Sequence, residues 1–171
     1  MVFPIISMSK KDRIITEDLA YLKMARVCAK KEYSPFDISR KLSRMGFDYD
    51  TAERIIVRLK NENFLNEERY TRSYVNDKLR FNGWGVKKIE MSLRQKQLPQ
   101  EVIDKILDHY SGSELNQSLK PLLEKKWKRI KGDSEYEKKG KLIRYAVGRG
   151  FKMSDILECM KNMNLRITDD E

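Results

Sequence analysis

A pattern of apolar residues that returns about every 50 positions is the strongest constraint on how this chain folds. The first copy starts at Tyr33 and continues through two stretches with helical spacing. A shift of 51 residues places Tyr33 on Trp84 and aligns six further apolar columns, and a second shift of 53 residues aligns the six columns again. A period of this size indicates an array of small units. The six columns are Ile38, Ile89 and Leu142; Leu42, Leu93 and Ala146; Phe47, Leu98 and Phe151; Ala52, Ile103 and Ile156; Ile55, Ile106 and Cys159; and Ile56, Leu107 and Met160.

Each copy is predicted to contain three helices. Ser34 and Pro35 are typical of a helix start, because serine caps the free amides and proline suits the first helical position. Gly46 is typical of a helix end. A further amphipathic segment precedes each helix pair, at about residues 17–31, 66–81 and 119–131. The sequence therefore predicts an all-α protein of three tandem three-helix repeats that form an elongated, curved array.

The repeats are expected at residues 17–63, 64–110 and 119–163. Residues 111–118 are predicted to be a linker, and the stretch 109–118 is the expected flexible joint. The remaining ends are interpreted as an N-terminal tail, 1–16, and an acidic C-terminal tail, 164–171.

Trp84 lies between two glycines in a segment rich in lysine and arginine. It could stack on a nucleic-acid base, or it could be a structural side chain that clasps Ile89 in a hydrophobic staple at a helix start. The structural interpretation is favoured, because Tyr33 stands at the equivalent position of the first repeat. The residues expected to be structural are Tyr33, Gly46, Gly83, Trp84, Gly85, Gly150 and Phe151.

The net charge of +10 and the pI near 9.5 predict a polyanionic partner or an acidic protein surface. Any single basic residue is more simply interpreted as solvated surface. As a set, however, the outward cations of equivalent helices could line up as an interrupted positive stripe. The candidate residues of this stripe are Arg40, Lys41, Arg44, Lys87, Lys88, Arg94, Lys125, Lys128, Arg129, Lys138, Lys141, Arg144 and Arg149.

The sequence contains no pattern typical of a catalytic, phosphate-loop or zinc-protease site. His109 is interpreted as a local charge at a helix end, and Cys28 and Cys159 as buried apolar side chains. We therefore expect no enzyme activity, no cofactor and no metal. We also expect a monomer in a reducing cytoplasm, with no membrane span.

Three blocks of the chain resemble the RecX family, the bacterial regulators of the RecA recombinase. They are KEYSPFDISRKLSRMGF at 31–47, FLNEERYTRSYVNDKLRFNGWGVKKIEMSLRQKQL at 64–98 and IRYAVGRGF at 143–151. The match spans about residues 17–163, and the middle block is the most specific. Asn66 departs from the family pattern, where aspartate is usual, and Ala146 stands where a larger aliphatic residue is usual.

The resemblance implies a regulator without catalysis that binds the RecA filament on DNA and restrains ATP turnover and strand exchange. The alternative left open is a general nucleic-acid-binding helical module without a specific protein target. Binding to bare single- and double-stranded DNA is expected to be weak and to fall steeply with salt. The two hypotheses differ in whether RecA-coated DNA is bound at physiological salt.

Overall fold

The computed structural model describes residues 15–165, and every regular element within them is an α-helix. Most of the two predicted tails therefore lies outside the described residues. The chain divides into two compact units, Met1–Asn66 and Glu67–Glu171. Within residues 15–165, no helix has the length and apolar character that crossing a membrane requires.

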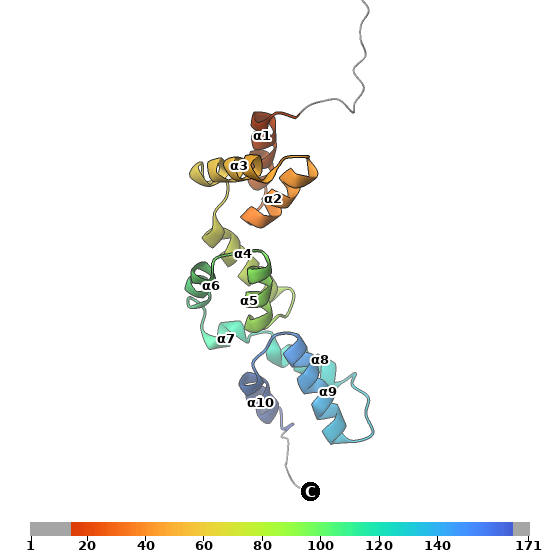
Figure 1. Cartoon of the computed structure of the whole chain (residues 1–171). Coiled ribbons are helices and arrows are strands. Elements are labelled where there is room, and N and C mark those ends of the chain that lie inside the picture. The colour runs from red at the N-terminus through yellow and green to blue at the C-terminus, as the bar shows by residue number, and fades with distance from the viewer. Residues whose placement is uncertain (1–14, 166–171) are drawn as a thin grey trace, which may run out of the picture. The chain divides into compact units, whose positions relative to one another are not determined.

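The first unit holds one three-helix repeat, made of α1 (Glu17–Cys28), α2 (Pro35–Arg44) and α3 (Tyr49–Asn61) (Figure 1). Its helix starts follow from local capping. The Ser34 hydroxyl accepts the amide of Asp37 at 3.1 Å, with proline at the first position of α2, so this predicted start is confirmed. Gly46 follows α2 with a φ of 92°, in the left-handed region that ends helices.

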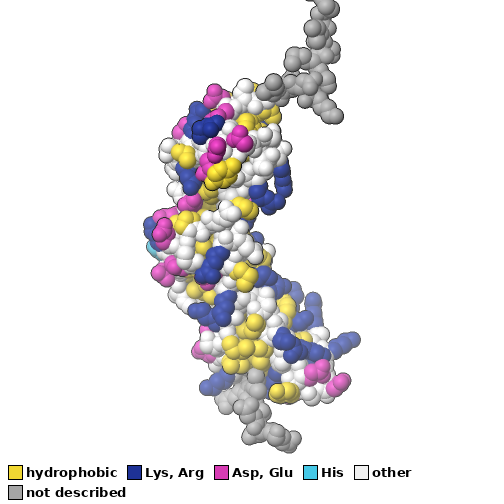
Figure 2. All heavy atoms as spheres, in the orientation of Figure 1, with side chains coloured by type: hydrophobic (Ala, Val, Ile, Leu, Met, Phe, Trp, Pro, Cys, Tyr) yellow, Lys and Arg dark blue, Asp and Glu magenta, His cyan; other side chains and the backbone are white. Residues whose placement is uncertain are grey.

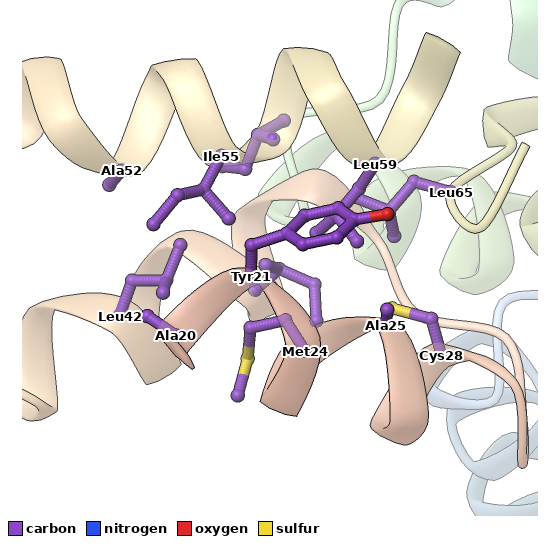
Figure 3. Packing of buried hydrophobic residues seen from close by; sticks show 12 residues of the cluster. Ala20, Tyr21, Met24, Ala25, Cys28, Leu42, Ala52, Ile55, Leu59 and Leu65 are labelled. Atoms are coloured by element: carbon purple, nitrogen blue, oxygen red, sulfur yellow. The ribbon is translucent and has the colours of Figure 1, made fainter. Parts of the chain in front are cut away.

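Apolar side chains of the first repeat face one another between its helices. Figure 3 shows the ring of Tyr21, from α1, reaching toward α3 among Ile55 and Leu59. The buried face of α3 is the predicted one, because its buried residues are Ala52, Ile55, Ile56 and Leu59. Helices of this length are marginal alone, and burial of the shared apolar face is what stabilises them.

The second repeat consists of α4 (Glu67–Arg80), α5 (Val86–Gln95) and α6 (Gln100–Leu107). Its core contains the predicted columns, with Ile89, Leu93, Ile103 and Ile106 all fully buried. Gln97, which aligns with Gly46, also has a positive φ, at 58°. The left-handed turn is therefore kept in this repeat without glycine.

The predicted linker contains a short helix, α7 (Gly112–Leu115). Ser111 and Glu114 form a capping box at its start. Leu115 packs against the core of the second repeat, and the Asn116 amide donates to Asp155 at 2.9 Å. The segment 111–118 thus contacts both of the repeats that it joins.

The third repeat is formed by α8 (Leu119–Trp127), α9 (Glu135–Gly148) and α10 (Met153–Asn162). Pro121 lies in the first turn of α8, as its missing amide requires. The core of this repeat buries Leu123, Leu142 and Phe151. The prediction of tandem three-helix repeats is therefore confirmed.

Backbone contacts lock the second repeat to the third. The Gly85 amide donates to the carbonyl of Arg149 at 2.8 Å, and the Lys87 amide donates to the carbonyl of Gly150 at 3.1 Å. These carbonyls replace a side-chain cap, which Gly85 cannot supply at the start of α5. A β-carbon on Gly85 would lie 2.4 Å from the Gly150 carbonyl carbon, and one on Gly150 would lie 2.4 Å from Lys88. Both positions therefore require glycine.

Trp84 lies half-buried against the cluster that contains Ile89, immediately before the cap residue of α5. We expect Trp84→Ala to lower the free energy of unfolding by about 2–3 kcal/mol, less than for a fully buried tryptophan because part of the ring contacts solvent. Urea unfolding followed by circular dichroism measures this change. A variant of unchanged stability would contradict the structural role.

Gly150→Ala should destabilise the chain by about 2–4 kcal/mol, because the new methyl group meets Lys88 and the φ of 91° is strained for alanine. The matched control is Gly148→Ala, two residues earlier in α9, where a β-carbon has nothing within 4 Å. The control should be neutral or slightly stabilising. Equal melting temperatures for the two variants would rule out the close contact.

Candidate functional site

An aromatic ring between two cations occurs in each repeat. In the first repeat this ring is Tyr33, with the ammonium of Lys31 at 4.7 Å and that of Lys41 at 5.2 Å from its centroid. Arg40 lies over Phe36 nearby, at 5.8 Å. A cation over an exposed ring gains about 0.5–1 kcal/mol, so these side chains are held in place more than a solvated lysine is.

Trp84 is the corresponding ring of the second repeat. The ammonium of Lys88 lies 4.7 Å from its centroid and that of Lys78 lies at 5.0 Å. Lys78 also lies 4.9 Å from the Tyr74 ring and donates to the Asn82 side chain at 3.5 Å. Trp84 therefore packs on the core with part of its surface and orders two lysines with the rest.

The ring of the third repeat is Tyr145, which lies at another position in the repeat. Lys126 lies 4.8 Å and Arg149 5.4 Å from its centroid. Arg149 also donates to the Tyr145 hydroxyl at 3.2 Å and to the backbone carbonyl of Asn82 at 3.0 Å. Because Asn82 belongs to the loop that carries Trp84, the second and third clusters meet at the junction between the two repeats.

We name this meeting point the junction surface and define it by Lys78, Trp84, Lys88, Lys126, Tyr145 and Arg149. Two of the predicted basic residues, Lys88 and Arg149, belong to it. Figure 2 shows Lys and Arg side chains gathered over the part of the second unit that holds α8 and α9. The arrangement suits binding of anionic groups, because lysine and arginine are the side chains that neutralise phosphates.

Other predicted cations are engaged within the fold. Arg94 contacts Glu90 at 2.5 Å and donates to Gln100 at 2.7 Å. The Lys141 ammonium lies 2.5 Å from Glu137 and donates to the backbone carbonyl of Lys131. The hydrogen bond from the Lys141 ammonium holds the pKa of the Glu137 carboxyl below the ordinary value. The charge that Arg94 and Lys141 present to a partner is therefore reduced.

The remaining predicted cations are distributed over both units. Lys87 is exposed at the start of α5, and Lys138 and Arg144 lie on α9. Exposed basic residues of the α8 region are Lys125, Lys128 and Arg129. Arg40, Lys41 and Arg44 lie in the first unit. A continuous stripe along all three repeats stays a prediction.

Sequence reasoning missed Lys31, Lys78, Lys126 and Tyr145. A usable sequence signal for these contacts was present. In several places an aromatic residue is followed four positions later by a cation, and residues with this spacing are neighbours on a helix. The pairs are Phe36 and Arg40, Tyr74 and Lys78, Trp84 and Lys88, and Tyr145 and Arg149. Nothing comparable marks Lys126, which reaches Tyr145 from another helix.

The residues considered for catalysis have ordinary surroundings. His109 is exposed, and its Nδ1 lies 2.5 Å from the carbonyl of Lys105, one turn earlier. Cys28 is buried, and partial burial raises the pKa of the Cys159 thiol, which favours the unreactive protonated form. Within residues 15–165, no group of three or more His, Cys, Asp or Glu side chains could hold a metal ion.

Family models match both repeats of the second unit. The model described as the second three-helix domain of RecX matches residues 66–107, and that of the third three-helix domain matches residues 113–160. The latter match begins inside the predicted linker, at α7.

Regulatory protein RecX of Prosthecochloris aestuarii is 31% identical over 135 residues, which cover 78% of this chain and 85% of the relative. Its namesake in Clostridium perfringens is 29% identical over 137 residues, covering 79% of this chain and 62% of the relative.

Solved structures share the fold. A crystal structure of regulatory protein RecX has a TM-score of 0.78 at 23% identity, covering 85% of this chain and 73% of that one. The crystal structure of RecX from Lactobacillus salivarius has a TM-score of 0.75 at 21% identity, covering 87% of this chain and 97% of that one. With two matched family domains and a relative that is similar over most of both chains, this chain belongs to the RecX family of regulatory proteins.

Proposed function

We propose that this chain binds the filament that the RecA recombinase forms on DNA and restrains its ATP hydrolysis and strand exchange. Membership of the RecX family is the observation that carries this proposal. The ordered cations of the junction surface support it, because a filament of protein on DNA is a large polyanionic target.

The proposed mechanism is a multivalent clamp. Each repeat presents a small cationic cluster, and several weak contacts to neighbouring protomers add through effective concentration. The backbone bonds from Gly85 to Arg149 and from Lys87 to Gly150 hold the second and third repeats together. A clamp of this kind opposes the shifts between protomers that accompany ATP turnover, or blocks protomer addition.

The direct test is a titration of RecA ATPase activity on single-stranded DNA, with this chain at ratios well below one per recombinase protomer. Progressive inhibition supports the proposal. An ATPase rate that is unaffected even at equimolar chain would refute it.

Lys141→Glu combined with Arg144→Glu should weaken inhibition, raising the half-inhibitory concentration roughly tenfold through charge repulsion on α9. Loss of the exposed ion pair between Lys141 and Glu137 should cost less than about 1 kcal/mol of stability. ATPase titration measures the first effect and thermal unfolding the second.

The matched control is Lys23→Glu with Arg26→Glu, which makes the same change in net charge on the exposed side of α1. It should inhibit nearly as well as the unmodified chain. Equal losses in both double variants would show that net charge, and no particular face, governs binding.

The alternative is a general nucleic-acid-binding module, favoured by the net charge of +10. Salt separates the two functions. Between about 50 and 200 mM salt, binding to bare DNA should fall steeply, while binding to RecA-coated DNA with bound nucleotide should persist. Fluorescence anisotropy of labelled DNA measures both. Parallel salt dependence for bare and coated DNA would favour the general module.

A further inference from the structure

Phe81 is the most exposed large apolar side chain of the described residues. It directly follows α4, and 82% of its surface is accessible to solvent. Along the sequence, no other large hydrophobic residue between Val57 and Met91 is classed as exposed. Neither the core nor the aromatic and cation clusters described above use this ring.

The loop that carries Phe81 is held from both sides. The Phe81 amide donates to the Asp77 carbonyl at 2.9 Å, and the Trp84 amide donates to the Lys78 carbonyl at 3.1 Å. From the third repeat, Arg149 donates to the Asn82 carbonyl at 3.0 Å. Because the backbone at the base of the ring is already ordered, a partner that binds Phe81 pays little entropy for ordering the loop.

The surroundings of the ring are strongly basic. Residues 77–88 contain Lys78, Arg80, Lys87 and Lys88 against a single acidic residue, Asp77, which lies one helical turn before Phe81. Two of these lysines are stacked on Trp84, and Arg149 joins them from α9. A largely exposed aromatic ring therefore lies in a short basic segment, in which Lys78 and Lys88 are held on Trp84.

A protein socket would bury Phe81 best if further exposed apolar side chains surrounded the ring, and in this segment only the half-buried Trp84, which two lysines cover, adds apolar surface. A base of single-stranded nucleic acid needs only the face of the ring for stacking, while its phosphates need cations a few ångströms away. Bases of a duplex are already stacked on one another and cannot offer a face. The chemistry of the loop thus fits a single strand.

We propose that Phe81 stacks on a base of single-stranded nucleic acid, with Lys78, Lys87 and Lys88 bound to the adjoining phosphates. The contact goes beyond the proposed function, because it is made directly and needs no recombinase. It gives the chain a preference for single strands over duplex that charge alone does not provide. Stacking is insensitive to salt, whereas the phosphate contacts are not.

The test is anisotropy of a fluorescein-labelled oligothymidine of about 20 nucleotides, titrated with the full chain at several salt concentrations. Phe81→Ala should weaken binding by about 5- to 100-fold without changing the slope of log K against log salt. Phe81→Tyr should restore most of the affinity. Lys87→Gln with Lys88→Gln should instead reduce the slope by about 1.4, since each phosphate contact contributes about 0.7 on single strands.

Tyr136→Ala is the matched control for loss of an exposed ring. Tyr136 is 75% accessible, but Glu135 and Glu137 flank it. This variant should bind the oligonucleotide as the unmodified chain does. Circular dichroism should show unchanged helicity for Phe81→Ala, because the residue is largely exposed and belongs to no core cluster.

Several outcomes would overturn the proposal. The first is failure of the unmodified chain to bind the oligonucleotide at about 50 mM salt. The second is an affinity of Phe81→Ala for the oligonucleotide equal to that of the unmodified chain. The third is a loss of affinity of Phe81→Ala for a hairpin duplex as large as its loss for the single strand. If Phe81→Ala lost affinity only for RecA-coated DNA, the ring would be a protein anchor instead. Since the assay contains no recombinase, its failure would leave the ATPase test of the proposed function standing.

Discussion

Burial of the repeated apolar columns is the interaction on which the rest of this structure depends. Each helix is too short to be stable alone in water, so its formation and its packing happen together. Ile38 with Leu42, and Ile89 with Leu93, are fully buried in their repeats, and the third repeat achieves the same with Leu142 and Ala146. Once these columns face inward, the remaining faces of the helices, rich in lysine and arginine, must face solvent. The cationic surface is thus a geometric consequence of the core.

The period of the columns made the helical repeats predictable, and the local caps at Ser34 and Gly46 placed helix ends correctly. Glycine at 85 and 150 was predicted as structural, but its full reason could not be read from the sequence. Each of these glycines faces backbone of another repeat, and the carbonyls of Arg149 and Gly150 cap α5. Capping rules consider only residues within a few positions, so a cap supplied from a distant turn escapes them. The helix within the predicted linker was missed because four residues give no periodic signal.

The candidate site was less predictable than the fold. Charge and helix period identified which cations face outward, but not which of them find a partner in the fold. Whether Lys141 contacts Glu137 or solvent depends on side-chain rotamers, and the two states differ by less than about 1 kcal/mol. The stacking of Lys88 on Trp84 could be inferred from their spacing, whereas that of Lys126 on Tyr145 required the packing of α8 against α9. Phe81 was overlooked because an apolar residue at a helix end is usually interpreted as part of the core.

The loop between α4 and α5 helps to join two repeats and also carries exposed side chains. Its backbone joins the second repeat to the third, through Arg149 and the carbonyl of Asn82, and it carries Trp84, the ring of the junction surface near which Lys78 and Lys88 lie. The rigidity that keeps the two repeats together therefore also fixes the positions of the cations and of Phe81. Under the proposed function, a change that loosens the joint is expected to weaken binding even if it removes no contact to a partner. Conversely, Phe81 is 82% exposed and belongs to no core cluster, so its removal is expected to leave the joint intact, and variants of one loop can test stability and the proposed binding separately.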